Sequence, residues 1–394
     1  MKTLRHIIYI CIARLFVACS TTDHLPEGEN LYTGVKKMKV HGQKGTPAED
    51  VAVTEVKAAL AYKPNGSLLG SSSKRSPLQL GLWIYNAYVD KPRKGFNKWM
   101  FNSFAGTPVT ISSVSPETRT KVATNILQNY GYFRGNVDYT LIDQKNPRKQ
   151  RIAYDIHLGE PYLYDSIRYA FRDSIQDSII HATEKEAYLH QGDQFSTLNL
   201  TNEKDRIVSA FRNNGLYYYR PDYINYFADS TNIPYRVKLL VVPDLDVPDY
   251  ASRQFYFGNT SVYIRKSRTR TAGQRRRRNG ESEVFDDSIQ RRRLKIAYQG
   301  DKIPIAPRVV MKNFKFHSRQ MFNQSSVDQT LTNLHRMDIF SNVRLAFTPR
   351  DTTSLNDTID TRIDLTMDQL IDAECDFSFT HKSNSQIGPA GGIT

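Results

Sequence analysis

The chain has 394 residues, a length that allows two to four domains. Apolar residues make up 39% of it and aromatic residues 11%, with 23 Tyr and 19 Phe, which is enough for real cores and favours sheets over helices. The net charge is +14, and two arginine-rich clusters at 265–278 and 291–293 hold a large share of it. The three cysteines, at positions 11, 19 and 375, exclude a disulfide framework and lack metal-ligand spacing.

The N-terminus has the form of an export signal. Lys2 and Arg5 precede an apolar run at 7–13, which is too short to cross a bilayer as a helix. We expect residues 1–18 to be a signal peptide and residues 19–31 to be a polar tether.

The residues before Cys19 resemble a bacterial lipobox, in which cleavage exposes the cysteine for acylation. Phe16 stands where Leu is commoner, and Arg14 interrupts the apolar run. The resemblance implies a mature chain that begins at Cys19 and is held by acyl chains, each buried CH₂ of which contributes about 0.8 kcal/mol. By lipoprotein analogy, Ser20 in place of Asp favours the outer membrane. The alternative is an ordinary secretory signal whose cysteine is incidental.

Beyond the tether, the pattern predicts a strand at 32–40 and a helix at 48–61, where apolar residues recur at helical spacing. Residues 67–105 fit no simple template. Within them, 78–88 has the pattern of an amphipathic helix. An apolar cluster nearby consists of Trp99, Met100, Phe101 and Phe104.

A helix and two strands follow. Ser115 is a candidate N-cap with Pro116 at the first helical position, and Gly131 stands where a C′ glycine ends a helix. Strands are expected at 136–143 and 151–158, the second alternating apolar and polar residues as in a sheet with one covered face.

The same order of elements returns twice. The second set has a strand at 162–171, helices at 173–189 and 198–214, and strands at 221–229 and 235–242. The third set has a strand at 253–264, the arginine-rich interruption, a segment at 306–313, a helix at 325–337, and strands at 343–349 and 361–367. Each set is predicted to be a β-α-α-β-β module.

One short phrase marks the end of a helix in all three sets. It reads NYGYF at 129–133, NNGLY at 213–217 and, more loosely, RMDIF at 336–340. The alignment brings Leu127, Phe211 and Leu334 to one column. Repetition of this kind predicts tandem modules. The structural residues of the repeat are Gly131, Phe133, Gly215, Tyr217 and Phe340.

The predicted architecture is α+β. The expected modules are 32–160 with an insertion at about 67–105, 161–245, and 250–370 with a basic insertion at about 265–300. Residues 373–380 alternate apolar and polar side chains, as a transmembrane barrel strand or any edge strand does.

Sequence motifs of common enzymes are lacking. The sequence has no phosphate loop, Gly-x-Gly-x-x-Gly, His-Glu-x-x-His or Gly-x-Ser-x-Gly. His181, Glu184 and His190 have no common metal-site spacing, and a solvated helix face explains them. Scattered carboxylates leave a glycosidase pair open. We expect neither an enzyme nor a cofactor or metal site.

The basic insertion admits several interpretations. Clustered Arg neutralises phosphates, but an exported chain rarely meets nucleic acid, and the insertion lacks interleaved aromatic residues. A solvated loop is the plain interpretation. The functional one is contact of Arg275, Arg276, Arg277 and Arg278 with anionic lipid headgroups.

Together these features resemble the periplasmic part of the BamA/TamA superfamily, in which polypeptide-transport-associated (POTRA) domains precede an outer-membrane barrel. Gly131-Tyr132-Phe133, Val137 and Gly159-Glu160-Pro161-Tyr162 are typical of such domains. Leu25-Pro26-Glu27-Gly28 and Leu31-Tyr32, following Cys19, resemble the lipid-anchored TamA-like branch, TamL. The resemblance covers most of residues 19–380.

The resemblance implies a non-enzymatic assembly or translocation factor. Its POTRA domains would bind unfolded outer-membrane proteins or a TamB-like periplasmic protein by strand addition, and pass cargo to a C-terminal barrel, of which 371–394 would be the truncated start. It also implies a place at the outer membrane, with the modules in the periplasm, contact with outer-membrane lipids and an anchor at Cys19. The second closing strands (151–158, 235–242, 361–367) or the first strands are the candidate binding edges.

Three alternatives remain at this stage. A lipid-tethered surface or periplasmic protein that binds a ligand or glycan would use exposed aromatic residues, and Tyr217-Tyr218-Tyr219 is the best candidate. A cargo-secretion transporter of the same superfamily would share the modules. An exported hydrolase would need a catalytic group that the sequence does not reveal.

Overall fold

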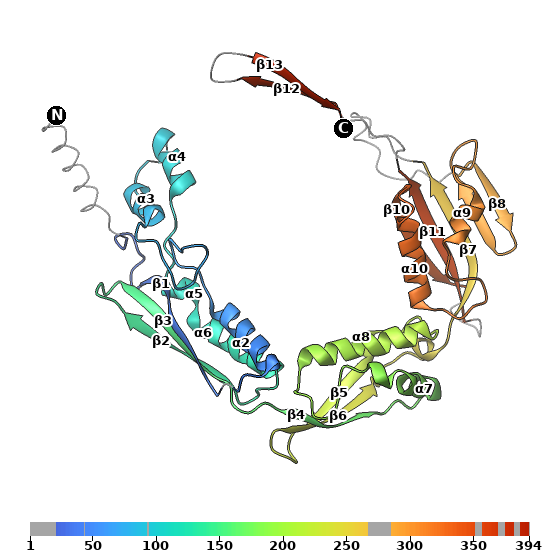
Figure 1. Ribbon diagram of the computed structural model, residues 1–394, viewed down its shortest axis with the longest axis horizontal. Coiled ribbons are helices and arrows are strands. Elements are labelled where there is room, and N and C mark those ends of the chain that lie inside the picture. The colour runs from blue at the N-terminus through green and yellow to red at the C-terminus, as the bar shows by residue number, and fades with distance from the viewer. Residues whose placement is uncertain are drawn as a thin grey trace. The chain divides into compact units, whose positions relative to one another are not determined.

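The computed structural model describes residues 21–42, 44–92, 94–266, 285–350 and 357–368, together with the backbone of 375–381 and 387–393 (Figure 1). The predicted signal peptide, Cys19 and Arg275–Arg278 lie outside the described residues. Contacts divide the chain into two compact units. One comprises Met1–Arg168, Tyr188–Asn202 and Phe227–Leu240, and the other comprises Tyr169–Ala187, Glu203–Tyr226 and Val241–Thr394. The structure is α+β, as predicted.

The first sheet has the strand order β1-β3-β2, with β1 parallel and β2 antiparallel to β3. The elements are β1 (Leu31–His41), α2 (Pro47–Leu60), α6 (Pro116–Asn129), β2 (Asn136–Asp143) and β3 (Lys149–His157). Thr46 caps α2 by accepting from the Glu49 amide, and α2 and α6 close a core around Tyr32, Leu127 and Ile152.

Ser115 differs from its predicted role as a side-chain cap. It stands before α6 with φ of 50° and makes no side-chain cap bond. Its hydroxyl instead donates to the carbonyl oxygen of Ser112, at 2.7 Å, because a short helix, α5 (Ile111–Val114), ends there.

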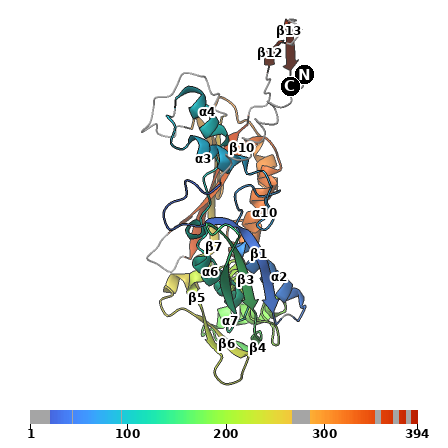
Figure 2. The same ribbon diagram turned by 90° about the vertical axis from the view of Figure 1, so that its left-hand side faces the viewer.

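The insertion at 67–105, which matched no template, contains two helices. They are α3 (Leu80–Tyr88), close to the predicted helix, and α4 (Gly95–Phe104), and Figures 1 and 2 show them side by side. The start of α3 and the segment just after α4 approach closely, since the Gly106 amide donates to the Gly81 carbonyl at 2.9 Å.

The second sheet has the order β4-β6-β5. Its module contains β4 (Leu163–Tyr169), α7 (Ser174–Ala182), η1 (Glu184–Glu186), α8 (Thr197–Asn213), η2 (Pro221–Tyr223), β5 (Ile224–Asp229) and β6 (Arg236–Pro243). The predicted helix at 173–189 is too long. It ends at Ala182 because the Thr183 hydroxyl donates to the carbonyls of Ile179 and Ile180, which closes the last turn.

The third sheet has five strands in the order β10-β11-β7-β9-β8. The elements from residue 249 onwards are η3 (Asp249–Ser252), β7 (Tyr256–Arg265), β8 (Asp287–Arg291), β9 (Leu294–Tyr298), α9 (Pro307–Lys312), α10 (Gln324–His335), β10 (Phe340–Pro349) and β11 (Thr358–Met367). The basic insertion is therefore not a plain loop throughout. Its last part forms the hairpin β8–β9, which pairs with β7 and widens the sheet.

Two further strands, β12 (Cys375–His381) and β13 (Ile387–Ile393), form an antiparallel pair. Among the described residues, none of the helices has the length and apolar character needed to cross a membrane.

Candidate functional site

The repeated phrase ends a helix with a left-handed residue in each module. Gly131 has φ of +80° and Gly215 has φ of +96°, and Asp338 occupies the same column with φ of +52°. In the first two modules the amide of the residue after the glycine donates a hydrogen bond to a carbonyl in the last turn of the helix. Tyr132 donates to Leu127 and Leu216 donates to Phe211, both at 3.0 Å. This is the bonding pattern of a Schellman motif.

Each of these glycines also contacts the segment that begins the next module. The Tyr162 amide donates to the Gly131 carbonyl at 2.9 Å, and the Phe255 amide donates to the Gly215 carbonyl at 2.8 Å. A Cβ atom on Gly131 would lie 2.9 Å from the Phe195 carbonyl oxygen. The repeat therefore forms a joint between consecutive modules, here called joint 1 at Gly131 and joint 2 at Gly215.

Side chains of the following module satisfy the last carbonyls of the preceding helix. In joint 1, Gln194 Nε2 donates to the Tyr130 carbonyl at 2.6 Å. In joint 2, Gln254 Nε2 donates to the equivalent Asn214 carbonyl at 3.0 Å, and Asn323 Nδ2 donates to the Asn213 carbonyl at 2.9 Å. The final carbonyls of a helix lack partners within it, so these bonds tie the modules together where the helix end needs donors.

Aromatic rings fill both joints. The Phe133 ring centroid lies 4.9 Å from that of Tyr162 and 5.0 Å from that of Phe195. The Tyr217 centroid lies 4.9 Å from that of Phe322. The sequence pattern did not predict the aromatic partners of the repeated phrase, which are Tyr162, Phe195 and Phe322. The available signal was an aromatic residue two positions before α8 and before α10.

The tyrosines at 217–219 are packed and do not form an exposed aromatic surface. Tyr219 is buried, with its centroid 4.7 Å from that of Phe211. Tyr218 packs against Tyr250 and Phe255, at 5.1 and 5.2 Å between centroids. This removes the observation that favoured a glycan-binding surface.

The third copy of the phrase runs into the first closing strand of its module, β10. Phe340 is buried at the start of β10, and Leu334 is buried in the same column as Leu127 and Phe211. The Asp368 amide donates to the Ile339 carbonyl at 2.9 Å.

The three histidine-region residues are not gathered into a site. His181 Nδ1 lies 2.9 Å from the Asp177 carbonyl oxygen, and His190 Nδ1 lies 3.3 Å from Asp193 Oδ2. In the part of the chain that the structure describes, no group of three or more His, Cys, Asp or Glu side chains has the arrangement of a metal site.

The second closing strands were candidate binding edges in the sequence, but none of them lies at the edge of its sheet. β3, β6 and β11 are each the central strand of a three-strand set, between the first strand and the first closing strand. The helices carry the chain across so that the last strand pairs parallel to the first, as β3 does to β1 and β11 does to β7. The first closing strand, which forms a hairpin with the last strand, then lies at the edge of the sheet.

The first strands are edges or near-edges, but the chain itself covers them. The Tyr32 amide donates to the Val109 carbonyl and the Val35 amide to the Ser72 carbonyl, both at 2.8 Å. In β4, Tyr164 exchanges backbone bonds with Asp193 and Gly192, at 2.9 and 2.8 Å. In the third sheet, β9 pairs with β7.

The remaining edges are the first closing strands β2, β5 and β10, together with β8 at the far side of the third sheet. Within the described residues, β2 pairs with β3 alone, in a register without shifts, and contains neither Lys nor Pro. Tyr139 and Leu141 on β2 are 37% and 40% exposed, and Phe227 on β5 is 62% exposed. Lys and Pro commonly protect natural edge strands, and neither occurs in β2 or β5.

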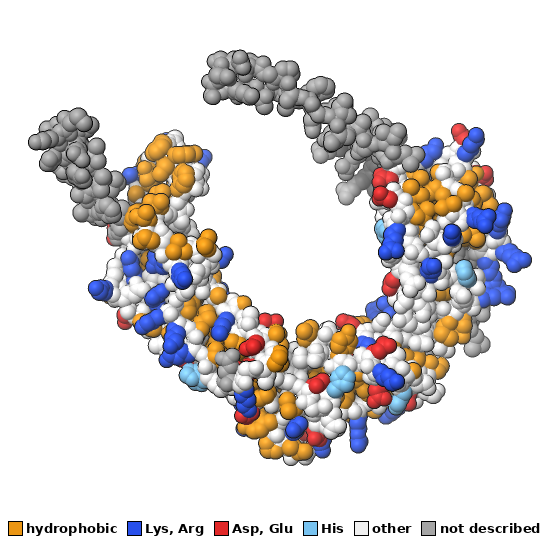
Figure 3. Space-filling view, in the orientation of Figure 1, with side chains coloured by type: hydrophobic (Ala, Val, Ile, Leu, Met, Phe, Trp, Pro, Cys, Tyr) orange, Lys and Arg blue, Asp and Glu red, His pale blue; other side chains and the backbone are white. Residues whose placement is uncertain are grey.

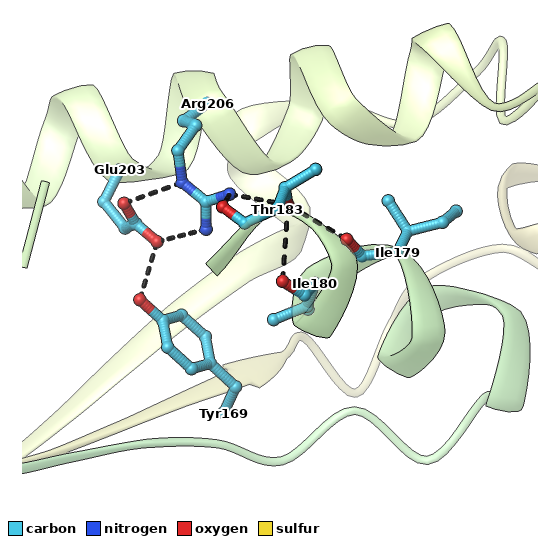
Figure 4. A network of polar contacts seen from close by, with 6 residues as sticks. All are labelled: Tyr169, Ile179, Ile180, Thr183, Glu203 and Arg206. Carbon is cyan, nitrogen blue, oxygen red and sulfur yellow. Dashed lines mark hydrogen bonds and ion pairs between the residues drawn. The ribbon is translucent and has the colours of Figure 1, made fainter. Parts of the chain in front are cut away.

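A buried charge network stabilises the second module (Figure 4). Glu203 Oε1 accepts from the Tyr169 hydroxyl at 2.7 Å, and Arg206 donates to both carboxylate oxygens, at 2.6 and 3.0 Å. Arg206 Nη1 also donates to the Thr183 carbonyl at 3.0 Å, which joins the end of α7 to α8. Burial, and then the bond to Glu203, raises the pKa of Tyr169. Every member has a partner, so the network is structural.

The second arginine cluster lines a surface depression in the third module. Arg291, Arg292 and Arg293 surround it with Arg319, and Arg293 Nη1 donates to Ser318 Oγ at 3.2 Å. These guanidinium groups are exposed. They form a basic surface in the described part of the third module.

No protein-family model and no curated protein sequence matches this chain. Among solved structures it is similar to Haemophilus influenzae BamA POTRA3-5, with 12% identity over 87% of this chain and 99% of that chain and a TM-score of 0.36. POTRA1-3 of the periplasmic domain of Omp85 from Anabaena gives 12% identity over 88% and 98% of the two chains, with a TM-score of 0.26. CdiB from Acinetobacter baumannii gives 13% over 56% and 31%, with a TM-score of 0.20. The fold of the chain is defined by the strand order of each sheet.

Proposed function

We propose that the chain is the periplasmic part of an outer-membrane assembly or translocation factor of the BamA/TamA type, and that it binds unfolded outer-membrane proteins by strand addition at β2 and β5. The observation that carries this proposal is the uniform pattern of edges. In each of the three module sheets the first strand has a further backbone partner from the chain itself, and the first closing strand is an edge.

The chemistry of these edges suits an unfolded barrel precursor. An edge strand presents unpaired N–H and C=O groups, and an extended chain has the same groups to satisfy. Pairing through the main chain gives affinity with little sequence preference, while side chains such as Tyr139 and Phe227 add apolar contact. No covalent step is needed, so the proposed factor is not an enzyme.

The wider assignment follows from the resemblance in sequence. The modules at 32–160, 161–245 and 250–370 would lie in the periplasm, with acylated Cys19 in the outer membrane and a barrel beginning at 371. A TamB-like protein is the expected periplasmic partner. Arg275, Arg276, Arg277 and Arg278 are proposed to contact anionic lipid headgroups.

The test is amide hydrogen exchange of the full chain with and without a peptide from an outer-membrane barrel strand. We expect new protection in β2 (Asn136–Asp143) and β5 (Ile224–Asp229). The central strand β3 (Lys149–His157) is the internal control, because both of its sides are already paired. N-methylation of alternate residues removes the N–H donors along one of the two edges of an extended peptide. Of the two possible methylation patterns, we expect weaker binding only for the one that blocks the edge paired with β2 or β5. Peptide binding without protection in β2 or β5 would refute strand addition.

A further inference from the structure

The helices α3 and α4, here called the apolar hairpin, leave most of their apolar side chains exposed or only partly buried. Leu82 is the single buried residue of α3, and α4 has none. Figure 3 shows hydrophobic side chains gathered over these two helices. Those with more than half of their surface exposed are Leu80, Phe96, Trp99 and Phe104. Short helices in water are stabilised mainly by packing of an apolar face. Leu82 packs inward and Tyr85 lies against Phe101, but the face that carries Phe96, Trp99 and Phe104 is exposed.

The exposed side chains form a continuous aromatic cluster. The Trp99 ring centroid lies 5.7 Å from that of Phe96 and 5.5 Å from that of Phe104. Both tryptophans of the chain, Trp83 and Trp99, belong to this hairpin. Tryptophan and phenylalanine are the residues that amphipathic helices insert at the boundary between headgroups and acyl chains.

The charges around the cluster have one dominant sign. Between residues 80 and 104 the basic residues are Lys91, Arg93, Lys94 and Lys98, and the acidic residue is Asp90. The Asp90 carboxylate lies 2.6 Å from His24 Nε2, within the tether. An apolar face bordered by Lys and Arg is complementary to a bilayer with anionic headgroups, since the basic groups reach phosphates while the rings enter the interface.

The hairpin is packed against the segment that follows the proposed lipid anchor. Leu82 of α3 forms a small core with Leu25 and Leu31 of the tether. Leu25 is six residues after Cys19 in the sequence. Six extended residues span at most about 20 Å, so an acyl anchor at Cys19 would keep the hairpin close to the membrane surface.

We propose that the apolar hairpin is a membrane-binding element that inserts Phe96, Trp99 and Phe104 into the interface of a bilayer containing anionic headgroups. It acts as a second attachment beside the N-terminus. Membrane binding by the hairpin is independent of strand addition at β2 and β5, which lie on other elements of the fold.

The two tryptophans make the proposal directly testable in the full chain. Trp83→Phe leaves Trp99 as the single reporter. With phosphatidylcholine vesicles containing phosphatidylglycerol, we expect a blue shift of Trp99 emission, and quenching when the lipid acyl chains are brominated. The control carries Trp83→Phe, Trp99→Phe and Phe227→Trp, which moves the reporter to an exposed position on β5. Its emission should not be quenched.

Vesicle binding gives an independent readout. Phe96→Ser with Phe104→Ser should reduce partitioning about tenfold or more, because two exposed aromatic side chains no longer enter the interface. Leu245→Ser removes an apolar side chain that is 97% exposed elsewhere and should leave partitioning unchanged. Replacing Lys91, Lys94 and Lys98 by Gln should weaken binding to the anionic vesicles and not to pure phosphatidylcholine.

Two results would overturn the proposal. One is unchanged Trp99 emission in vesicle-bound protein. The other is a dimer in sedimentation velocity that Phe96→Ser with Phe104→Ser dissociates, which would identify a second copy of the chain as the occupant. Loss of peptide protection at β2 and β5 would leave the Trp99 result unaffected, so failure of the proposed function is distinguishable.

Discussion

The amide of Phe255 donates a 2.8 Å hydrogen bond to the carbonyl oxygen of Gly215. The Tyr162 amide makes the same bond to the Gly131 carbonyl at 2.9 Å. Gly131 lies 84 residues before Gly215 in the sequence. The glycine therefore has two roles: it ends a helix in a left-handed conformation, and it admits the backbone of the next module at close range. A side chain at this position would disturb both.

Gly131→Ala is expected to destabilise the chain by about 1 kcal/mol or more, because Ala at φ of +80° is strained and its Cβ would lie 2.9 Å from a carbonyl oxygen. Gly215→Ala should behave in the same way. Thermal unfolding measures both. Gly192→Ala is the matched control, with φ of +89° and no atom within 4 Å of the added Cβ, and it should cost less. Unchanged melting of both joint variants would refute the alignment of the repeats.

Glu203→Ala should destabilise the second module strongly, by about 3–5 kcal/mol, since it leaves the buried Arg206 without its carboxylate. Chemical denaturation followed by far-UV circular dichroism would measure the loss, because both tryptophans lie in the first module. The control is Glu117→Ala, which removes an exposed ion pair with Lys121 at 2.7 Å. That pair is solvated, so little change is expected. Equal effects of the two substitutions would contradict the structural role of the network.

Stability should fall at alkaline pH. Burial raises the pKa of Tyr154 from 10.0 to about 12. The folded chain therefore holds this proton more tightly than the unfolded chain, so the stabilisation is complete below pH 10 and is lost as the pH rises from 10 towards 12. Urea unfolding across this range tests the effect.

Tyr154→Phe is the matching variant for that titration. The Tyr154 hydroxyl is buried and has no hydrogen-bond partner among the described residues, so its removal should cost little at neutral pH. The variant should lose less stability than the wild-type chain between pH 10 and 12. An identical pH profile would show that other groups control the alkaline transition.

Cys19→Ser should abolish incorporation of a fatty-acid probe, because the acylated thiol is removed. The measurement is metabolic labelling in a cell that exports the chain. The neighbouring Ser20→Ala variant retains the thiol and should still be labelled. Labelling that persists in Cys19→Ser would contradict the lipobox interpretation.

Several features followed from the sequence by local rules. The sequence predicts where two helices terminate, at Gly131 and Gly215, and it predicts the α+β class and the order β-α-α-β-β. These features depend on backbone preferences and hydrophobic periods within a few residues. The prediction was wrong where a nearby side chain makes a different hydrogen bond. The Thr183 hydroxyl donates to the Ile179 carbonyl and α7 ends early, and the Ser115 hydroxyl donates to the Ser112 carbonyl of the preceding helix.

The tertiary structure decided which groups face solvent and which meet. Strand order is non-local, because β3 enters the sheet beside β1 only after the chain has crossed it with two helices, and this leaves β2 as the open edge. The partners of Phe133 in joint 1, Tyr162 and Phe195, are distant in sequence and are selected by packing. The exposure of Trp99 likewise depends on what the fold leaves uncovered, which periodicity alone does not encode.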